Sequence, residues 1–291
     1  KLKEKHPYEA SKEKNKSNIN QIIESFKYFQ TEIFNSQSSQ YLEKIEEIGN
    51  GKSHKFIKAL MNKFYTLKEI NNEKSKTNSQ NIQRLIDEFD IMVSLHHPNI
   101  LKVHGKFISD ENQQNPSILL EFCPFNLEQK IKKENISKVQ QVFWIYQIAE
   151  GMKYIHSRKI IHHNLKPSNI LVSEKGIIKI SDFDKAQLNK ANSEKTEMDD
   201  VYAFGSIVYF VLSSGKNVEN ADMNTMTFSL LAKQLIYACC SVQPECRPTF
   251  ENICDVLEKN DFNLISLSQH EVQSIKKLIE QHKLLIKSDS D

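Results

Sequence analysis

The stretch IIHHNLKPSNIL, residues 160–171, reads like a catalytic loop, and the chemistry that it would suit is phosphoryl transfer to a hydroxyl group. Such a loop needs a carboxylate that takes the proton from the substrate hydroxyl group. This sequence has Asn164 at that point, and the amide of asparagine is neutral and not basic. What the loop can do therefore depends on the segments that position it.

Length and charge limit the classes of protein. A chain of 291 residues can bury a large core and suits one two-lobed domain or two modest domains. Its 39 basic and 37 acidic side chains give a net charge of +2, so charge does not indicate nucleic acid or a membrane surface as partner. No apolar run approaches the roughly 20 residues of a membrane span. We expect no nucleic-acid partner and no membrane span.

The five cysteines indicate a reduced setting. They are odd in number and form no C-x-x-C pair, which argues against a disulfide framework or a structural zinc site. The first residues lack the apolar core of a signal peptide, so we expect a cytoplasmic, intracellular location. The chain does not begin with methionine, which indicates a piece of a longer protein.

Periodicity divides the chain into four regions. Residues 1–40 predict a polar arm followed by an amphipathic helix, which either packs on the domain behind it or docks a partner. Residues 41–120 predict a small β-rich lobe with one helix. The predicted strands and helix fall at 42–60 (two strands and a turn), 63–70, 82–95 (the helix), 99–108 and 117–122.

Residues 121–260 predict a larger, mostly α-helical lobe, with a ligand cleft at the seam near residues 121–125. Helices are expected at 139–156, 201–214, 231–240 and 251–260, and short strands at 169–174 and 177–183. Residues 261–291 predict a further helix with a Ser268 and Glu271 capping box. Its apolar stripe, which either packs on the domain or meets a partner, is Val272, Ile275, Leu278, Ile279 and Leu285.

The order and spacing of these elements over about residues 41–260 resemble the eukaryotic protein kinase domain. The segments HPNILKVHG and SVQPECRPTFENI look most like the tyrosine-kinase-like group. The resemblance implies an α+β bilobal kinase-like fold, with the predicted amino- and carboxy-terminal helices as additions. It also implies ATP and Mg²⁺ as ligands of the cleft.

The resemblance assigns the phosphate-binding residues. Gly49 and Gly51 match the glycine-rich loop, in which backbone amides approach phosphates, while His54 stands in place of the third glycine. Lys68 matches the lysine that contacts phosphates, and Glu88 matches its ion-pair partner on the helix.

The adenine pocket is assigned in the same way. Leu120 takes the gatekeeper position, Leu171 the pocket floor, and the Glu121 carbonyl and Cys123 amide the hinge hydrogen bonds. Phe56 and Thr66 replace smaller residues beside the adenine ring, which narrows or fills the pocket.

The catalytic residues match only in part. Lys166 and Asn169 fit the loop pattern, and Lys166 resembles Ser/Thr kinases, but Asn164 occupies the position of the base. Asp182 matches the Mg²⁺ ligand, with Asn169 as its metal-binding partner. Asp184 replaces the glycine that normally follows, and the sequence does not decide whether it binds a cation or repels phosphates.

The activation segment is short. Residues 183–199 leave seventeen positions between Asp182 and Asp200 and contain no Ala-Pro-Glu, so the shelf for a peptide substrate is missing. His163 replaces the arginine that clamps a phosphorylated loop, and Arg247 has lost its glutamate partner. The usual control by phosphorylation is therefore not expected, although Ser193 and Thr196 remain in the segment.

The retained positions are mostly architectural. The four regulatory-spine positions, anchored by Asp200, are Met92, Val103, His162 and Phe183.

Three hypotheses about function follow. The first is a pseudokinase, an ATP-binding signalling or scaffold module that has protein partners and lacks efficient phosphoryl transfer; the second is a slow Ser/Thr protein kinase; the third is an interaction module that binds no nucleotide.

Overall fold

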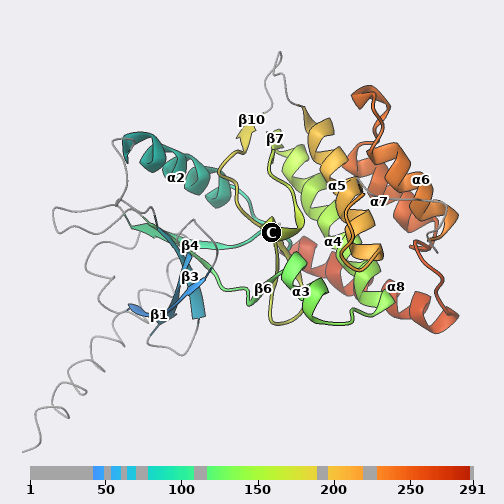
Figure 1. The fold of residues 1–291 in the computed structure, drawn as a ribbon, viewed down its shortest axis with the longest axis horizontal. Coiled ribbons are helices and arrows are strands. Elements are labelled where there is room, and N and C mark those ends of the chain that lie inside the picture. The colour runs from blue at the N-terminus through green and yellow to red at the C-terminus, as the bar shows by residue number, and fades with distance from the viewer. Residues whose placement is uncertain are drawn as a thin grey trace, which may run out of the picture.

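The computed structural model describes residues 42–48, 54–59, 64–69, 78–107, 117–188, 196–218 and 228–288. The expected bilobal α+β architecture is present, with a small sheet-and-helix lobe and a larger helical lobe (Figure 1). The predicted arm and helix within residues 1–40 lie outside the described residues.

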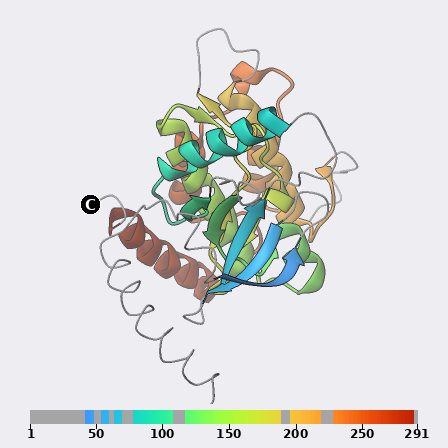
Figure 2. The same ribbon diagram turned by 90° about the vertical axis from the view of Figure 1, so that its left-hand side faces the viewer.

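The small lobe is a five-stranded antiparallel sheet with the strand order β1-β2-β3-β5-β4. Helix α2 packs on β4 and β5 and crosses above the strands in Figure 2. It turns an apolar face with Leu85 and Met92 into the core. The elements are β1 (Leu42–Ile48), β2 (His54–Ala59), β3 (Phe64–Glu69), α2 (Asn78–Val93), β4 (Val103–Phe107) and β5 (Ser117–Glu121).

The larger lobe is built around helix α4, which contacts α5, α7 and α8. The middle of α4 is buried on all sides because its sequence VFWIYQIA is apolar around the whole helix. The helices are α3 (Leu127–Lys133), α4 (Lys138–Ser157), α5 (Glu197–Leu212), α6 (Leu230–Cys239), α7 (Phe250–Lys259) and α8 (Gln269–Ser288). The short elements are β6 (Phe125–Asn126), β7 (Ile160–Ile161), β8 (Ile170–Val172), β9 (Ile178–Ile180), β10 (Gln187–Leu188) and the 3₁₀ helices η2 (Pro167–Asn169) and η4 (Pro244–Cys246).

Two helices differ from the sequence prediction. Helix α2 begins at Asn78, four residues before the predicted start at Ile82. Helix α3 was not predicted from the sequence. Its seven residues contain only two buried apolar side chains, too few to show a helical period. The signal that marks α3 is a capping box, in which Asn126 accepts from Gln129 N while Gln129 caps the Asn126 amide.

The carboxy-terminal helix α8 is docked on the larger lobe along α4. Its predicted capping box is present, since Ser268 N donates to Glu271 Oε2 at 2.8 Å and Glu271 N donates to Ser268 Oγ at 3.3 Å. Ile275 and Ile279 are buried as expected. Leu285 was wrongly placed in the packed stripe, because it is 50% exposed and His282 takes the inward position instead.

His282 joins α8 to the loop that follows α2. Its Nε2 lies 2.7 Å from Asn99 Oδ1, and the ring packs edge-on against Phe143. Burial lowers the pKa of His282 to about 4, so the ring stays neutral and donates to Asn99. The same asparagine donates Nδ2 to the carbonyl of Ile178, and its carbonyl accepts from Ile180 N at 2.7 Å. Helix α8 is thereby connected to β9, which leads to Asp182.

A glycine in α4, Gly151, allows the loop that contains Asn99 to approach the helix closely. A Cβ atom at Gly151 would come within 2.7 Å of Ile180 Cδ1 and 3.1 Å of Asn99 Cβ. The absence of a side chain there is needed for close packing of α4, β9 and the Asn99 loop.

Within the described residues, no helix is long and apolar enough to cross a membrane.

Replacing Ile279 by alanine tests the docking of α8. The side chain is 4% exposed, so Ile279→Ala is expected to lower the free energy of unfolding by about 2–5 kcal/mol. Urea denaturation followed by the fluorescence of the single, buried Trp144 measures the change. Leu285→Ala on the same helix is the control and is expected to change it by about 0.5 kcal/mol or less. Equal midpoints for Ile279→Ala and wild type would mean that α8 is not part of the folded unit.

Candidate active site

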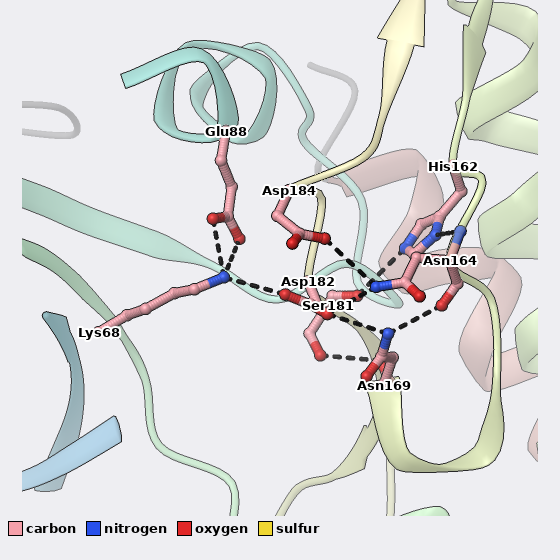
Figure 3. A network of polar contacts seen from close by, with 8 residues as sticks. All are labelled: Lys68, Glu88, His162, Asn164, Asn169, Ser181, Asp182 and Asp184. Carbon is pink, nitrogen blue, oxygen red and sulfur yellow. Dashed lines mark hydrogen bonds and ion pairs between the residues drawn. The ribbon is translucent and has the colours of Figure 1, made fainter. Parts of the chain in front are cut away.

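The buried ion pair between β3 and α2 is the first element of the site. Lys68 Nζ lies 2.6 and 2.7 Å from the two carboxylate oxygens of Glu88, and the two residues are 6% and 3% exposed (Figure 3). The contact expected between Lys68 and Glu88 is therefore formed. It fixes the position of α2 relative to the sheet, because a buried charge is stable only when paired.

Asp182 lies at the centre of a second set of contacts. Its Oδ1 is 3.0 Å from Lys68 Nζ, while its Oδ2 accepts from Asn164 Nδ2 at 2.8 Å and from Asn169 Nδ2 at 3.0 Å. Its φ of 66° is in the left-handed region, which aspartate tolerates better than most side chains. This turn directs the carboxylate back toward both lobes.

Asn164 is held by two carboxylates. Besides Asp182, its Nδ2 donates to Asp184 Oδ1 at 3.3 Å, so both amide hydrogens have acceptors. The contact with Asp184 was missed in the sequence analysis, which treated the two substitutions separately. Because the nitrogen faces these carboxylates, the amide has no basic atom to offer at the position of the missing base.

Asn169 ends the 3₁₀ helix η2 and joins the two segments of the site. Its Nδ2 donates to the Asn164 carbonyl at 2.8 Å as well as to Asp182, and its own carbonyl accepts from Ser181 Oγ at 2.8 Å. The amide nitrogen is thus used for structure, and the side-chain oxygen is the atom suited to a metal. Asp182 and Asn169 supply oxygen donors, which Mg²⁺ prefers, so the predicted metal pair is brought together.

Burial and the neighbouring charges together set the pKa values of the ion pair. Burial disfavours the charge of Lys68, but Glu88 and Asp182 outweigh it and raise the pKa of Lys68. Burial is also the main cause that raises the pKa of Glu88, with further contributions from Asp182 and Asp184 that Lys68 offsets only in part. The site is therefore rich in negative charge and depends on Lys68.

Asp200, at the start of α5, holds the catalytic loop by hydrogen bonds. Asp200 accepts from the amides of His162 and His163 at 2.8 and 2.9 Å and lies 3.0 Å from His156 Nε2. Burial by itself would raise the pKa of Asp200, but the hydrogen bonds from His156 and the His162 amide outweigh it and lower the pKa. Asp200 thus accepts, as a carboxylate, the hydrogen bonds that shape the loop.

The four spine positions are all buried, with Met92 at 2%, Val103 at 8%, His162 at 0% and Phe183 at 1% exposure. The rings of His162 and Phe183 are in contact, with centroids 4.7 Å apart. Burial lowers the pKa of His162, so it packs as a neutral ring. This packing is consistent with the apolar stack that the sequence predicts.

Strand register places the adenine-pocket positions in one row. Phe56 in β2 lies opposite Thr66 in β3, Thr66 opposite Leu120 in β5, and Leu120 opposite Val103 in β4. Residues directly opposite one another share a face of the sheet, so Thr66 and Leu120 point to the same side. Gly49 and Gly51 lie outside the described residues, and so does the side chain of Phe56.

The predicted hinge follows β5. The carboxylate of Glu121 lies 3.0 Å from Lys179 Nζ on β9, which ties the hinge to the larger lobe. Cys123 is buried, and burial raises the pKa of its thiol to about 12, so the side chain packs as an unreactive group. Leu171 on β8 is half-buried, and Lys166, within the catalytic loop, is exposed.

His163 and Arg247 have different contacts from those expected. His163, which replaces the arginine of the family, is half-buried, and its Nε2 lies 2.6 Å from Gln187 Nε2 on β10. The guanidinium group of Arg247 donates to the carbonyls of Ser241 and Met198 at 2.9 Å and stacks on Tyr202. Backbone carbonyls and an aromatic ring thus hold Arg247 in place of the missing glutamate.

A cavity of about 410 Å³ lies between the catalytic loop and α5. None of Lys68, Glu88, Asn169 or Asp182 lines it. Thr196, one of two hydroxyl residues noted in the segment, caps α5 by accepting from Met198 N. Ser193 lies outside the described residues. The cavity is lined by His163, Leu165, Asp199, Asp200, Tyr202, Ala203 and Arg247.

Comparison with known proteins agrees with this geometry. The family model described as protein kinase domain matches residues 41–204. A probable serine/threonine-protein kinase MRK1 homolog of Encephalitozoon cuniculi is 30% identical over 152 residues, which are 50% of this chain and 45% of that protein. The probable serine/threonine-protein kinase CCRP1 of Zea mays is 28% identical over 218 residues, 62% of this chain and 34% of that protein.

A third relative, the MAP kinase kinase kinase wis4 of Schizosaccharomyces pombe, is 32% identical over 126 residues, 41% of this chain and 8% of that protein. The chain thus spans less than half the length of each of these three relatives. Because the family model covers more than half of the chain, this protein belongs to the protein kinase domain family.

Removing Lys68 tests the electrostatic balance of the site. Lys68→Ala leaves the carboxylates of Glu88 and Asp182 without their ammonium group, and breaking such a buried pair costs about 3–5 kcal/mol. The pKa of Glu88, already raised, then rises further. A carboxyl group whose pKa is higher in the folded state stabilises that state at low pH and loses this effect as pH rises through the folded pKa.

The loss of melting temperature in Lys68→Ala is therefore expected to be larger at pH 8 than at pH 5. Thermal unfolding at the two pH values measures it. Lys132→Ala, which breaks the exposed pair with Glu128, is the control and is expected to change stability by about 1 kcal/mol or less. An equal loss at both pH values would contradict the proposed charge balance.

Proposed function

We propose that this protein is a pseudokinase that binds ATP and acts as a signalling or scaffold module without efficient phosphoryl transfer. The observation that carries the proposal is the contact of Asn164 Nδ2 with Asp182 Oδ2 at 2.8 Å. The group at the position of the base is a hydrogen-bond donor to the metal-binding carboxylate. An amide in this role cannot take a proton from a substrate.

The nucleotide-binding part of the proposal is supported by the residues that are preassembled. Glu88 holds the ammonium group of Lys68 beside Asp182. A positive charge suited to phosphates therefore already lies at the seam between the two lobes. Asp182 and Asn169 would hold Mg²⁺, which would neutralise phosphate charge. Leu120, Leu171, the Glu121 carbonyl and the Cys123 amide would enclose the adenine ring, with Gly49 and Gly51 above the phosphates.

A slow Ser/Thr protein kinase is the second candidate. The observation that favours it is the same intact arrangement of Lys68, Glu88 and Asp182, together with the names of the relatives. Loss of a general base typically lowers the rate by about 10²- to 10⁴-fold without abolishing it. The short activation segment weighs against it, because a peptide substrate has no shelf on which to lie.

The setting and the partners remain proposals. All five cysteines are free thiols, and Cys123, Cys239 and Cys254 are buried, which supports a reduced, cytoplasmic location. Protein partners are proposed because an assembled spine and ion pair provide two lobe arrangements that a partner can bias. The similarity to the tyrosine-kinase-like group stays a prediction from two sequence segments.

Thermal unfolding with ATP tests nucleotide binding. A ligand of the native state stabilises it by mass action, by about 2.7 kcal/mol at a concentration one hundred times its Kd. We expect millimolar ATP to raise the melting temperature, more so with Mg²⁺ because of Asp182 and Asn169. Lys68→Ala is expected to abolish the shift, measured against its own ligand-free melting temperature. No shift for wild type would contradict the proposal and favour a module that binds no nucleotide.

Restoring the carboxylate tests the claim about the peptide shelf. Asn164→Asp is expected not to phosphorylate a generic protein substrate, because residues 183–199 are too few to build the surface that holds one. Incorporation of γ-phosphate into casein or myelin basic protein measures it. Strong phosphorylation by Asn164→Asp would show that the base alone is missing and that the second candidate is nearly correct.

A further inference from the structure

The buried face of α8 contains one polar side chain. Helix α8 runs back toward the small lobe (Figure 1). Its buried residues are Ile275, Ile279 and His282, and His282 is 2% exposed. The Nε2 atom of His282 lies 2.7 Å from Oδ1 of Asn99, a residue that is also fully buried. The contact therefore joins two polar groups that water does not reach.

The second ring nitrogen of His282 adds nothing to the docking of α8. Within the described part of the chain, Nδ1 is buried and has no hydrogen-bond partner. A buried polar atom without a partner destabilises the folded state. A phenylalanine would fill a similar space against Phe143 without such an atom. What the histidine adds over an apolar ring is therefore the hydrogen bond between Nε2 and Asn99.

Asn99 in turn holds strand β9 at two points. Its Nδ2 donates to the carbonyl of Ile178 at 3.1 Å, and its backbone carbonyl accepts from Ile180 N at 2.7 Å. The carbonyl of Ile180 accepts from Leu101 N at 2.9 Å. Because Nδ2 of Asn99 is used for β9, Oδ1 is the atom toward His282, and it can only accept. The donor Nε2 of His282 thus fixes the orientation of the amide that holds β9.

The segments held by Asn99 lead to both carboxylates that contact Lys68. Strand β9 ends at Ile180, and the chain continues through Ser181 to Asp182, whose Oδ1 lies 3.0 Å from Lys68 Nζ. Asn99 itself lies in the loop that follows α2, the helix that carries Glu88. A shift of Asn99 therefore acts on both segments that carry the partners of Lys68.

We propose that His282 is a positioning residue for the nucleotide site, and that through Asn99 and β9 it sets the place of the Asp182 carboxylate relative to Lys68 and hence the affinity for ATP. The inference rests on the proposed binding of ATP. His282 acts through Asn99 and not by contact with the nucleotide. Helix α8 is then more than a support of the larger lobe, because one of its side chains controls the site.

Variants at position 282 separate the hydrogen bond from the packing. The Kd for ATP with Mg²⁺ is measured by titration calorimetry, and stability by thermal unfolding without ligand. His282→Phe keeps an aromatic ring and loses the donor, so it is expected to weaken ATP binding by about 5-fold or more. Its melting temperature is expected to stay near that of wild type. One buried acceptor lacks a partner in either chain, Nδ1 of His282 in wild type and Oδ1 of Asn99 in the variant.

Two further variants show which property the affinity follows. His282→Gln keeps an amide N–H donor and is expected to recover most of the affinity for ATP. His282→Ala loses the donor and the ring, so it is expected to bind ATP as weakly as His282→Phe while losing much more stability. Ile279→Val on the same helix is the control. It removes packing but no hydrogen bond, and it is expected to lower the melting temperature and leave the Kd unchanged.

Amide hydrogen exchange without ATP tests the route through β9. The amide of Ile180, which donates to the Asn99 carbonyl, is expected to exchange faster in His282→Phe than in wild type and at the wild-type rate in Ile279→Val.

The outcomes distinguish this inference from the proposed function. No binding of ATP by wild type would overturn both. Binding by wild type with an equal Kd for His282→Phe would overturn the inference alone, and so would a His282→Gln variant as weak as His282→Phe. Affinities that follow the melting temperatures of the variants would show a purely structural role. A weaker Kd without faster exchange at Ile180 would also overturn the inference, because the effect would not pass through β9.

Discussion

The site depends on one ammonium group, that of Lys68, which contacts two of the three carboxylates in the network. In the network of Figure 3, Lys68 contacts Glu88 and Asp182 directly, and Asp184 lies next to them through Asn164. Neutral amides at Asn164 and Asn169 complete the balance, because each donates a hydrogen bond without adding charge. A fourth acid, at position 164, would need a metal ion or a proton to be tolerated, so the amide belongs to the electrostatics of the whole site.

The contacts of Lys68 with Glu88 and Asp182 also join the two lobes. Lys68 and Glu88 belong to the small lobe, whereas Asp182 follows β9 of the larger lobe. Strand β9 is in turn held by Asn99, and Asn99 is held by His282 of α8. A displacement of α8 would therefore act first on the loop after α2 and on β9, the two segments that position Glu88 and Asp182.

Much of the fold could be predicted from the sequence, because long apolar periods such as those of α4 and α5 are insensitive to context. Helix α3 and the start of α2 could not, since short or polar segments are decided by caps and by tertiary packing. At the site, the pairing of Lys68 with Glu88 follows from the kinase register. The contact between Asn164 and Asp184 does not, because it joins two departures from the pattern that lie twenty positions apart.

The contacts of the short activation segment bear on how the site is controlled. His163 Nε2 lies 2.6 Å from the amide of Gln187 on β10, at a place where the family uses an arginine and a phosphate. Strands β7 and β10 also pair with each other through their backbones. With the spine packed and Lys68 paired, the site is assembled without loop phosphorylation. A ligand or partner that prefers one lobe arrangement can shift the equilibrium only by its difference in affinity for the two.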